Sequence, residues 1–345
     1  MKQFQVTKQD SSQRFDKYLK RLFPEMGTNF IYKMLRKKNI TLNNAKATGS
    51  ELIQTGDIVK CFFSDDTIDK FSGKTITNND SSLFSAIKEY KTAFTSLTGI
   101  KVLYEDTHIL LLNKPAGILS QKALPADLSI NEWMIGYLLH TKVVSEDSLK
   151  HFKPSVCNRL DRNTSGIVIC GKTLLGSREM SRILKDRSLQ KYYRAYVNGC
   201  LEGEKTLEGY HTKNKKNNQA KVLFSKPKFD TQEYDVITTA YYSIESNKHY
   251  SYLEIELITG KTHQIRAHLA AIGHPIVGDR KYVKALYTKT KEELPMKYPN
   301  HQLLHAYRVI FPDLDGELIH LSGKEFVCEE PTTFISFKQN IFNKL

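Results

Sequence analysis

The chain has 345 residues, of which 40% are hydrophobic, so we expect two domains. Its formal net charge of +14 predicts a polyanionic partner, either nucleic acid or an acidic membrane surface. The five cysteines form no Cys-x-x-Cys pair, which argues against a zinc site and a disulfide framework and favours an intracellular, reducing compartment. The first twenty residues lack an apolar core and no apolar run approaches the roughly 20 residues of a membrane span, so we predict neither a signal peptide nor a membrane segment.

Residues 1–63 are predicted to form a small separate unit of helices and short strands. Apolar residues recur at helical spacing in 13–23, and Thr28 or Asn29 can cap a second helix. Two short strands should follow, at 40–42 and 57–63, with a turn at Asn43-Asn44 before the second.

The charge of this unit is concentrated. It holds 12 Lys and Arg against 5 Asp and Glu, a net +7, so half of the chain's excess lies in less than a fifth of its length. This asymmetry favours a binding module over a uniformly basic protein, although a solvated basic helix pair would have the same composition. Arg36, Lys37 and Lys38 fall on the outward side of the second helix and are candidate RNA-binding residues.

Residues 64–100 are rich in Ser, Thr, Asn and Asp and are predicted to be a linker, with a short helix near 83–90. Beyond them, Ile109–Leu112 is an apolar run typical of a buried strand, and Lys114-Pro115 begins a turn directly after it.

A carboxylate flanked by guanidinium groups comes next. Asp161 lies between Arg159 and Arg162, and the apolar run Ile167–Cys170 after it predicts another buried strand. Neighbouring guanidinium groups favour the ionised form of a carboxylate. In isolation the pattern would be read as a salt bridge in a loop, because structural ion pairs far outnumber catalytic ones.

The second half of the chain alternates strands and helices. A helix is predicted over 174–185 and a strand over 191–199. The segment 211–228 has six lysines, Lys215 and Lys216 among them, and no acidic residue; it is either a solvated charge run or a phosphate contact. A strand over 253–258 precedes a helix over 262–272.

His263 and His268 lie five residues apart, so they do not share a helix face as a zinc-binding pair does. We interpret them as structural or RNA-facing and predict no metal site.

Six stretches resemble, in the same order, the motifs of the RluA/RluD-type pseudouridine synthases. They cover residues 101–335 and are Lys114-Pro-Ala-Gly, Asn158-Arg-Leu-Asp-Arg-Asn-Thr-Ser-Gly, Lys191-Tyr-Tyr-Arg-Ala-Tyr-Val-Asn-Gly, Gly260-Lys-Thr-His-Gln-Ile-Arg-Ala-His, His274–Tyr282 and Leu304–Phe311. The chain departs from the family where Asn158 replaces a histidine and where Lys261 replaces the commoner arginine.

The resemblance implies an α+β fold. Residues 101–345 would form the catalytic domain, with a mixed, mostly antiparallel sheet and a central cleft. Residues 1–63 resemble the small α/β RNA-binding domain named after ribosomal protein S-four, joined through the linker 64–100. Because the reaction turns uridine into its isomer, with no redox change and no imported group, the resemblance implies no cofactor and no metal.

The resemblance also assigns roles to residues. Asp161 would be the catalytic carboxylate, as nucleophile or as base, and Arg266 its cationic partner, with Arg159 and Arg162 as local competitors. Tyr193 would stack on the base and transfer a proton. The candidate RNA-binding residues are Arg36, Lys37, Lys38, Lys114, Arg159, Arg162, Lys215, Lys216 and His263.

We therefore predict a cytoplasmic, monomeric RNA pseudouridine synthase that acts on large-subunit ribosomal RNA. A synthase acting on tRNA and a non-catalytic RNA-binding or ribosome-assembly factor on the same scaffold are the alternatives. A hydrolase that pairs Asp161 with His263 is a further one, but the sequence supplies neither an oxyanion motif nor a serine elbow.

Overall fold

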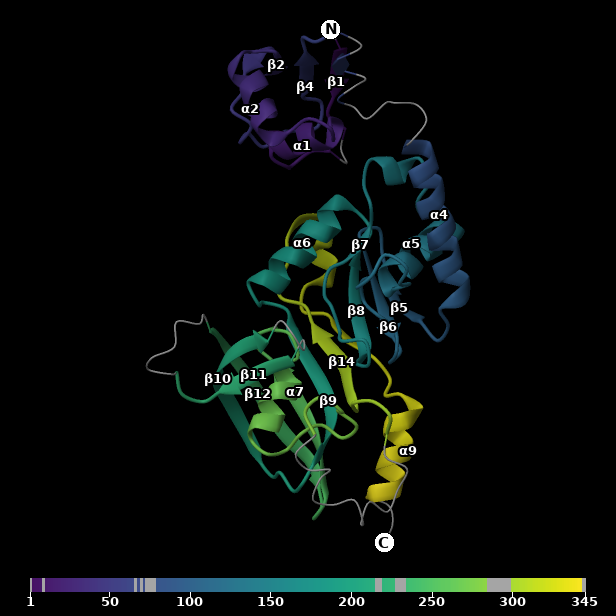
Figure 1. Ribbon diagram of the computed structural model, residues 1–345, viewed down its shortest axis with the longest axis vertical. Coiled ribbons are helices and arrows are strands. Elements are labelled where there is room, and N and C mark those ends of the chain that lie inside the picture. The colour runs from purple at the N-terminus through teal and green to yellow at the C-terminus, as the bar shows by residue number, and fades with distance from the viewer. Residues whose placement is uncertain are drawn as a thin grey trace. The chain divides into compact units, whose positions relative to one another are not determined.

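A computed structural model describes residues 2–7, 10–64, 67–68, 71, 79–214, 219–226, 234–283 and 299–342 (Figure 1). The chain folds into two compact units. One comprises 1–95, 133–154 and 173–175, and the other comprises 96–132, 155–172 and 176–345. The second unit contains every residue to which the sequence assigned a catalytic role.

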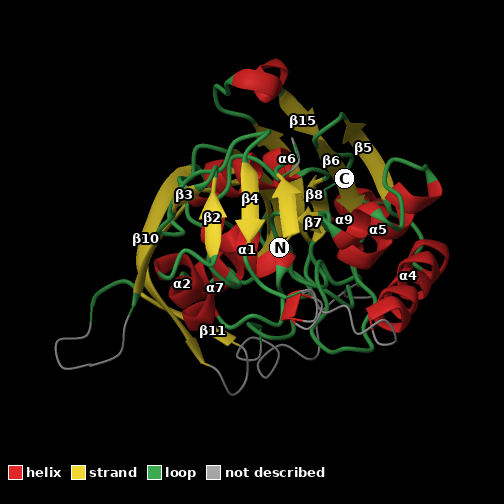
Figure 2. Cartoon of the chain, turned by 90° about the horizontal axis from the view of Figure 1, so that it is seen from above, coloured by secondary structure: helices red, strands yellow, loops and turns green. Residues whose placement is uncertain are grey.

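The first unit contains a small antiparallel sheet with the strand order β1 (Lys2–Gln5), β4 (Ile58–Cys61), β2 (Ile40–Leu42) and β3 (Ala45–Lys46). Figure 2 shows β2 and β4 side by side. The predicted turn between β2 and β3 is confirmed: Asn43 and Asn44 both have positive φ, as a two-residue hairpin turn requires.

Helices α1 (Phe15–Leu22) and α2 (Thr28–Arg36) complete this part of the unit. Their apolar faces are buried, with Phe15, Leu19 and Ile31 at most 1% exposed. The prediction of a Thr28 or Asn29 cap is wrong, because α2 already includes both residues and begins after Gly27 without a side-chain cap. Its last turn leaves Arg36 exposed, followed by exposed Lys37 and Lys38.

The helix predicted near 83–90 is confirmed and is longer than expected, because α4 spans Asn79–Ser96. The helix α5 (Ile130–His140) contributes Trp133 onwards to the same unit, before the short 3-10 turn η1 (Ser148–Lys150). Gly136 permits the close approach of these helices: a Cβ atom there would lie 2.2 Å from the Tyr90 carbonyl oxygen.

The second unit is built on a sheet of eleven described strands. Their order is β11 (Gln219–Leu223), β10 (Glu204–Asn214), β12 (Asp235–Ser246), β13 (Tyr250–Leu257), β9 (Gln190–Asn198), β14 (Leu304–Ile310), β8 (Ser165–Gly171), β6 (Ile109–Lys114) and β5 (Lys101–Glu105). Two short strands branch off, β15 (Glu325–Val327) on β14 and β7 (Ser155–Val156) on β8. Among these pairs only β14 and β8 are parallel, so the predicted mixed, mostly antiparallel sheet is confirmed.

The helical segments described beside this sheet include α6 (Leu174–Lys185), α7 (Gln264–Ala271), the 3-10 helix η2 (Gly316–Leu321) and α9 (Thr332–Ile341). Helix α7 packs against β10, β11 and β12. Both predicted buried strands are confirmed, since every residue of β8 is buried and so is every residue from Ile109 to Leu112. Apolar side chains of β6 and β8 form one core with Met180 and Ile183 of α6.

Gly166, the second residue of β8, allows this strand to meet β14 directly after the Asp161 loop. Its φ of 116° is accessible to few other residues, and a Cβ atom would lie 2.1 Å from the Ala306 carbonyl oxygen. The loop that carries Asp161 is therefore tied at one end to the middle of the sheet. Over the described residues, no helix is both long enough and apolar enough to cross a membrane.

Candidate active site

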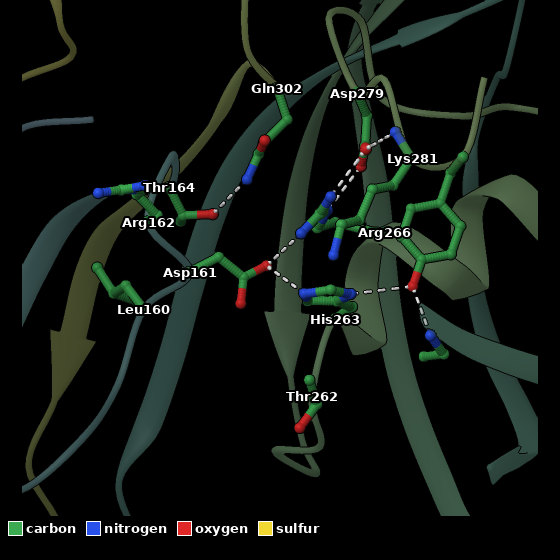
Figure 3. Close-up of polar contacts among 12 residues, drawn as sticks. Leu160, Asp161, Arg162, Thr164, Thr262, His263, Arg266, Asp279, Lys281 and Gln302 are labelled. Carbon is green, nitrogen blue, oxygen red and sulfur yellow. Dashed lines mark hydrogen bonds and ion pairs between the residues drawn. The ribbon is translucent and has the colours of Figure 1, made fainter. Parts of the chain in front are cut away.

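Asp161 lies in the loop between β7 and β8 (Figure 3). Its side chain is 27% exposed. Its carbonyl oxygen accepts a hydrogen bond from the Thr164 backbone N–H at 3.0 Å, which closes the loop into a turn before β8. A carboxylate is thus presented just before the fully buried strand β8.

Arg266 of α7 holds this carboxylate in place. Its Nη1 donates to Oδ2 of Asp161 at 2.7 Å, and its Nε and Nη2 donate to the two oxygens of Asp279 at 2.6 and 2.8 Å. The guanidinium and Asp279 are 7% and 1% exposed. Burial alone would lower the pKa of Arg266, but the hydrogen bonds and charges of Asp279 and Asp161 outweigh burial and raise that pKa, so the group stays cationic.

The two oxygens of Asp161 differ in their surroundings. Oδ2 accepts the Arg266 bond and faces Nε2 of His263 at 3.8 Å. Across the described residues, the protein makes no hydrogen bond to Oδ1. One oxygen is therefore held by the protein, and the other is left open to a reacting group.

The competitors Arg159 and Arg162 do not pair with Asp161. Both are exposed, and the described part of the chain shows no ion pair from either one to this carboxylate. Both guanidinium groups are therefore available on the surface beside the Asp161 loop, as their predicted RNA-binding role requires.

Lys114 is placed differently from the prediction. Its side chain is fully buried, and Nζ donates to the carbonyl oxygens of Pro115, Ile118 and Arg162 at 3.0, 2.8 and 3.0 Å. Burial lowers the pKa of Lys114 to about 7, whereas the three carbonyl acceptors and nearby Asp161 favour the charged form. Direct RNA contact by Lys114 does not fit this placement; the side chain ties the turn after β6 to the Asp161 loop.

Tyr193 of β9 is 7% exposed. Burial, and secondarily the charge of Asp161, raise its pKa far above the usual value, so the phenol is neutral and lies within the field of Asp161. The alternation of β9 points Tyr192 and Tyr196 to the other face, where Tyr192 stacks on Arg308 and Tyr196 on Tyr252. The structure therefore distinguishes Tyr193 from its neighbours.

His263 lies beside Asp161 just before α7, in the left-handed region with a φ of 54°. Its Nδ1 is 3.1 Å from the hydroxyl of Tyr282. Burial lowers its pKa to about 4, so it is neutral near pH 7 despite the nearby carboxylate. His268 is buried elsewhere on α7, 3.0 Å from Oγ1 of Thr239.

Asn158, which replaces the family histidine, fastens the other end of the Asp161 loop. Its side-chain oxygen accepts from the Ile169 N–H at 2.7 Å, and its side-chain nitrogen donates to the Ile167 carbonyl at 3.2 Å. The carboxamide thus satisfies two neighbouring backbone groups on the edge of β8.

The remaining candidates are spread over the chain. Arg36, Lys37 and Lys38 are exposed in the first unit, while Lys215 and Lys216 lie outside the described residues. Asp279 and Tyr282 were not predicted as site residues, although both belong to one of the six family-like stretches. The available signal was that Asp279 is the single carboxylate of that stretch. The described residues contain no group of three or more His, Cys, Asp or Glu side chains that could hold a metal ion.

Residues 108–271 match the RNA pseudouridylate synthase family. An uncharacterised RNA pseudouridine synthase of Mycoplasma genitalium is 30% identical over 315 residues, covering 90% of each chain. Ribosomal large subunit pseudouridine synthase C of Rickettsia prowazekii is 30% identical over 314 residues, covering 90% of this chain and 93% of the relative. The human RNA pseudouridylate synthase domain containing 4 shares the fold, with a TM-score of 0.54, 19% identity, and 75% and 97% of the two chains covered.

The architecture is an α+β fold. The similarities to the relatives define the protein as an isomerase. The chain belongs to the RNA pseudouridine synthase family.

Proposed function

We propose that this protein converts specific uridines of large-subunit ribosomal RNA to pseudouridine, with Asp161 as the catalytic carboxylate. The observation that carries the assignment is the asymmetry of Asp161: Oδ2 is bound to buried Arg266, while Oδ1 has no donor among the described residues. A carboxylate held by one oxygen can present the other to a nucleotide without losing its orientation.

Arg266 places a positive charge against Asp161 in a partly buried site. A carboxylate out of water favours its neutral form unless a cation compensates. Asp279 fixes the guanidinium through two further hydrogen bonds, so that Nη1 points to Asp161. An ionised Oδ1 serves equally as a nucleophile at the sugar or as the base that begins deprotonation of the sugar.

Tyr193 supplies a neutral phenol near that carboxylate. Its ring offers a face for a stacked base, and its hydroxyl can take part in proton transfer at carbon 5 late in the reaction. The target uridine has to leave its stack to reach this depth, so the exposed guanidinium groups of Arg159 and Arg162 are suited to hold the opened RNA.

Residues 1–63 would act as the RNA-binding module of this enzyme, with 64–100 as the connection and 101–345 as the catalytic domain. Exposed Arg36, Lys37 and Lys38, at the end of α2 and directly after it, provide cationic groups for phosphates. RNA modification of this kind favours a cytoplasmic protein. The candidate catalytic residues all come from the second unit of one chain, which favours a monomer.

Ribosomal RNA is favoured as the substrate by the names of the relatives. Synthase C of Rickettsia prowazekii and synthase D of Borreliella burgdorferi, 28% identical over 245 residues, are both named for the ribosomal large subunit. Transfer RNA is the alternative substrate. A non-catalytic binding factor is the alternative function, but it would have no need of a carboxylate that is held by one oxygen and open at the other.

Site-resolved mapping of pseudouridine in total RNA tests the proposal. Cells that lack this gene are complemented with the wild type, with Asp161→Ala or with no gene. The proposal predicts that one or a few sites in large-subunit ribosomal RNA disappear and return only with the wild type. Loss of sites from tRNA would identify tRNA as the substrate. An unchanged pseudouridine map would favour the non-catalytic factor.

A further inference from the structure

Tyr282 connects the backbone of β11 to the ring of His263, and through it to Asp161. The Tyr282 hydroxyl accepts a hydrogen bond from the Ala220 N–H at 2.9 Å and lies 3.1 Å from Nδ1 of His263. On its other side, the His263 ring faces Oδ2 of Asp161 with Nε2 (Figure 3). These contacts matter for function if Asp161 has the role proposed above, and the inference rests on that proposed function.

The direction of the contact between Tyr282 and His263 follows from counting protons. A phenol has one proton to donate, and its oxygen already accepts from Ala220. Over the described residues, Nδ1 of His263 is the acceptor within reach of that proton. The Tyr282 hydroxyl therefore donates, and Nδ1 is the bare nitrogen of the ring.

The ring itself is neutral. The groups that face it are Asp161 and Asp279, which favour its protonation, and Arg266 and Lys281, which oppose it. Burial outweighs these charges and lowers the pKa of His263 to about 4. A neutral imidazole has a single N–H, and since Nδ1 is bare, that N–H is on Nε2.

We propose that Tyr282 is a positioning residue that fixes the tautomer of His263, so that Nε2–H faces Oδ2 of Asp161 and leaves Oδ1 for the nucleotide. At 3.8 Å the N–H is too distant for a hydrogen bond, but it adds a second positive dipole beside Arg266 on the same oxygen. The opposite tautomer would aim a lone pair at the carboxylate and push Asp161 away.

The backbone supports this arrangement. His263 has a left-handed φ of 54°, a conformation that non-glycine residues adopt at some cost. Gln264 holds the turn, since its side-chain oxygen accepts from Oγ1 of Thr259 at 2.8 Å and from the Lys261 N–H at 3.1 Å. The backbone thus fixes the position of the His263 ring, but it does not determine which ring nitrogen carries the proton.

Tyr282→Phe isolates the hydroxyl, because the ring that lies 5.3 Å below the Arg266 guanidinium is retained. Tyr104→Phe is the matched control: it removes a hydroxyl that donates to Asp106 at 3.1 Å, away from the site. Nitrogen-15 NMR of histidine-labelled protein reports the tautomer without any substrate, and His263→Asn assigns the signal. We expect the wild type to show N–H on Nε2 and a bare Nδ1; N–H on Nδ1 would overturn the inference.

Turnover on RNA gives the second readout. Tyr282→Phe should lower kcat by between about tenfold and a hundredfold with KM unchanged, whereas Tyr104→Phe should resemble the wild type. His263→Gln, which can keep an N–H near Oδ2, should retain more activity than His263→Asn, which is too short. If Tyr282→Phe matches Tyr104→Phe in both tautomer and kcat, the inference fails; if the wild type itself makes no pseudouridine, the proposed function fails and the tautomer result stands alone.

Discussion

Two charged clusters, one in each unit, use charge in opposite ways. In the first unit, Arg36, Lys37 and Lys38 lie on the surface. In the second unit, the Arg266 guanidinium and the Asp279 carboxylate are 7% and 1% exposed and hydrogen-bonded to each other. An exposed charge acts through its field on a polyanion, and it can be removed at little cost to the fold. A buried charge fixes geometry, and removing it leaves its partners uncompensated.

The largest effect should come from breaking the buried network. Arg266→Met leaves Asp279 buried without its cation and Asp161 without its anchor, so we expect a loss of about 3–5 kcal/mol in the free energy of unfolding and loss of turnover. Chemical denaturation and an RNA turnover assay measure the two losses. Arg182→Met is the control, because that guanidinium forms its ion pairs with Glu179 and Asp186 on the surface of α6. Equal stabilities of the two variants would contradict the contrast between buried and exposed charge.

A smaller effect is expected at Asn158. Asn158→Ala removes the hydrogen-bond partner of the Ile167 carbonyl and that of the Ile169 N–H. This loss should lower the free energy of unfolding by about 1–3 kcal/mol and loosen the Asp161 loop. Asn158→His restores one donor and one acceptor, so it should lose less stability and less kcat than the alanine variant. An alanine variant with wild-type stability and kcat would show that the carboxamide does not position the loop.

The smallest effect on stability is expected in the first unit. Replacing Arg36, Lys37 and Lys38 together by alanine should change the free energy of unfolding by no more than about 0.5 kcal/mol for each position, because all three are exposed. RNA affinity should fall, and the slope of log affinity against log salt should flatten by up to about two units. Affinity and salt slope equal to those of the wild type would remove these residues from the RNA interface.

The sequence predicted what depends on local pattern. The buried strands around Ile109–Leu112 and Ile167–Cys170, the Asn43-Asn44 turn and the α6 helix follow from periodicity and turn chemistry, and all are present. The contact between Asp161 and Arg266 joins residues 105 positions apart. Spacing cannot show such a contact, and only the family resemblance nominated it.

The features that the sequence did not predict depend on which residues the tertiary structure brings together. A lysine before a proline looks like a surface turn, yet three backbone carbonyls converge on Lys114 and make burial tolerable. The roles of Asp279 and Tyr282 likewise arise from what the fold places beside them, namely Arg266 and His263. Thr28 could have capped α2, but the helix begins one residue earlier than that prediction required.

In the proposed mechanism Asp161 performs the chemistry and the surrounding charges hold it in place. Asp161→Asn separates the two contributions, because it keeps the shape of the side chain and removes its charge. Single-turnover formation of pseudouridine and RNA affinity should be measured on the same purified protein, in wild type and variant. We expect no detectable product with RNA affinity retained. Product formation by Asp161→Asn at a rate near that of the wild type would contradict the account.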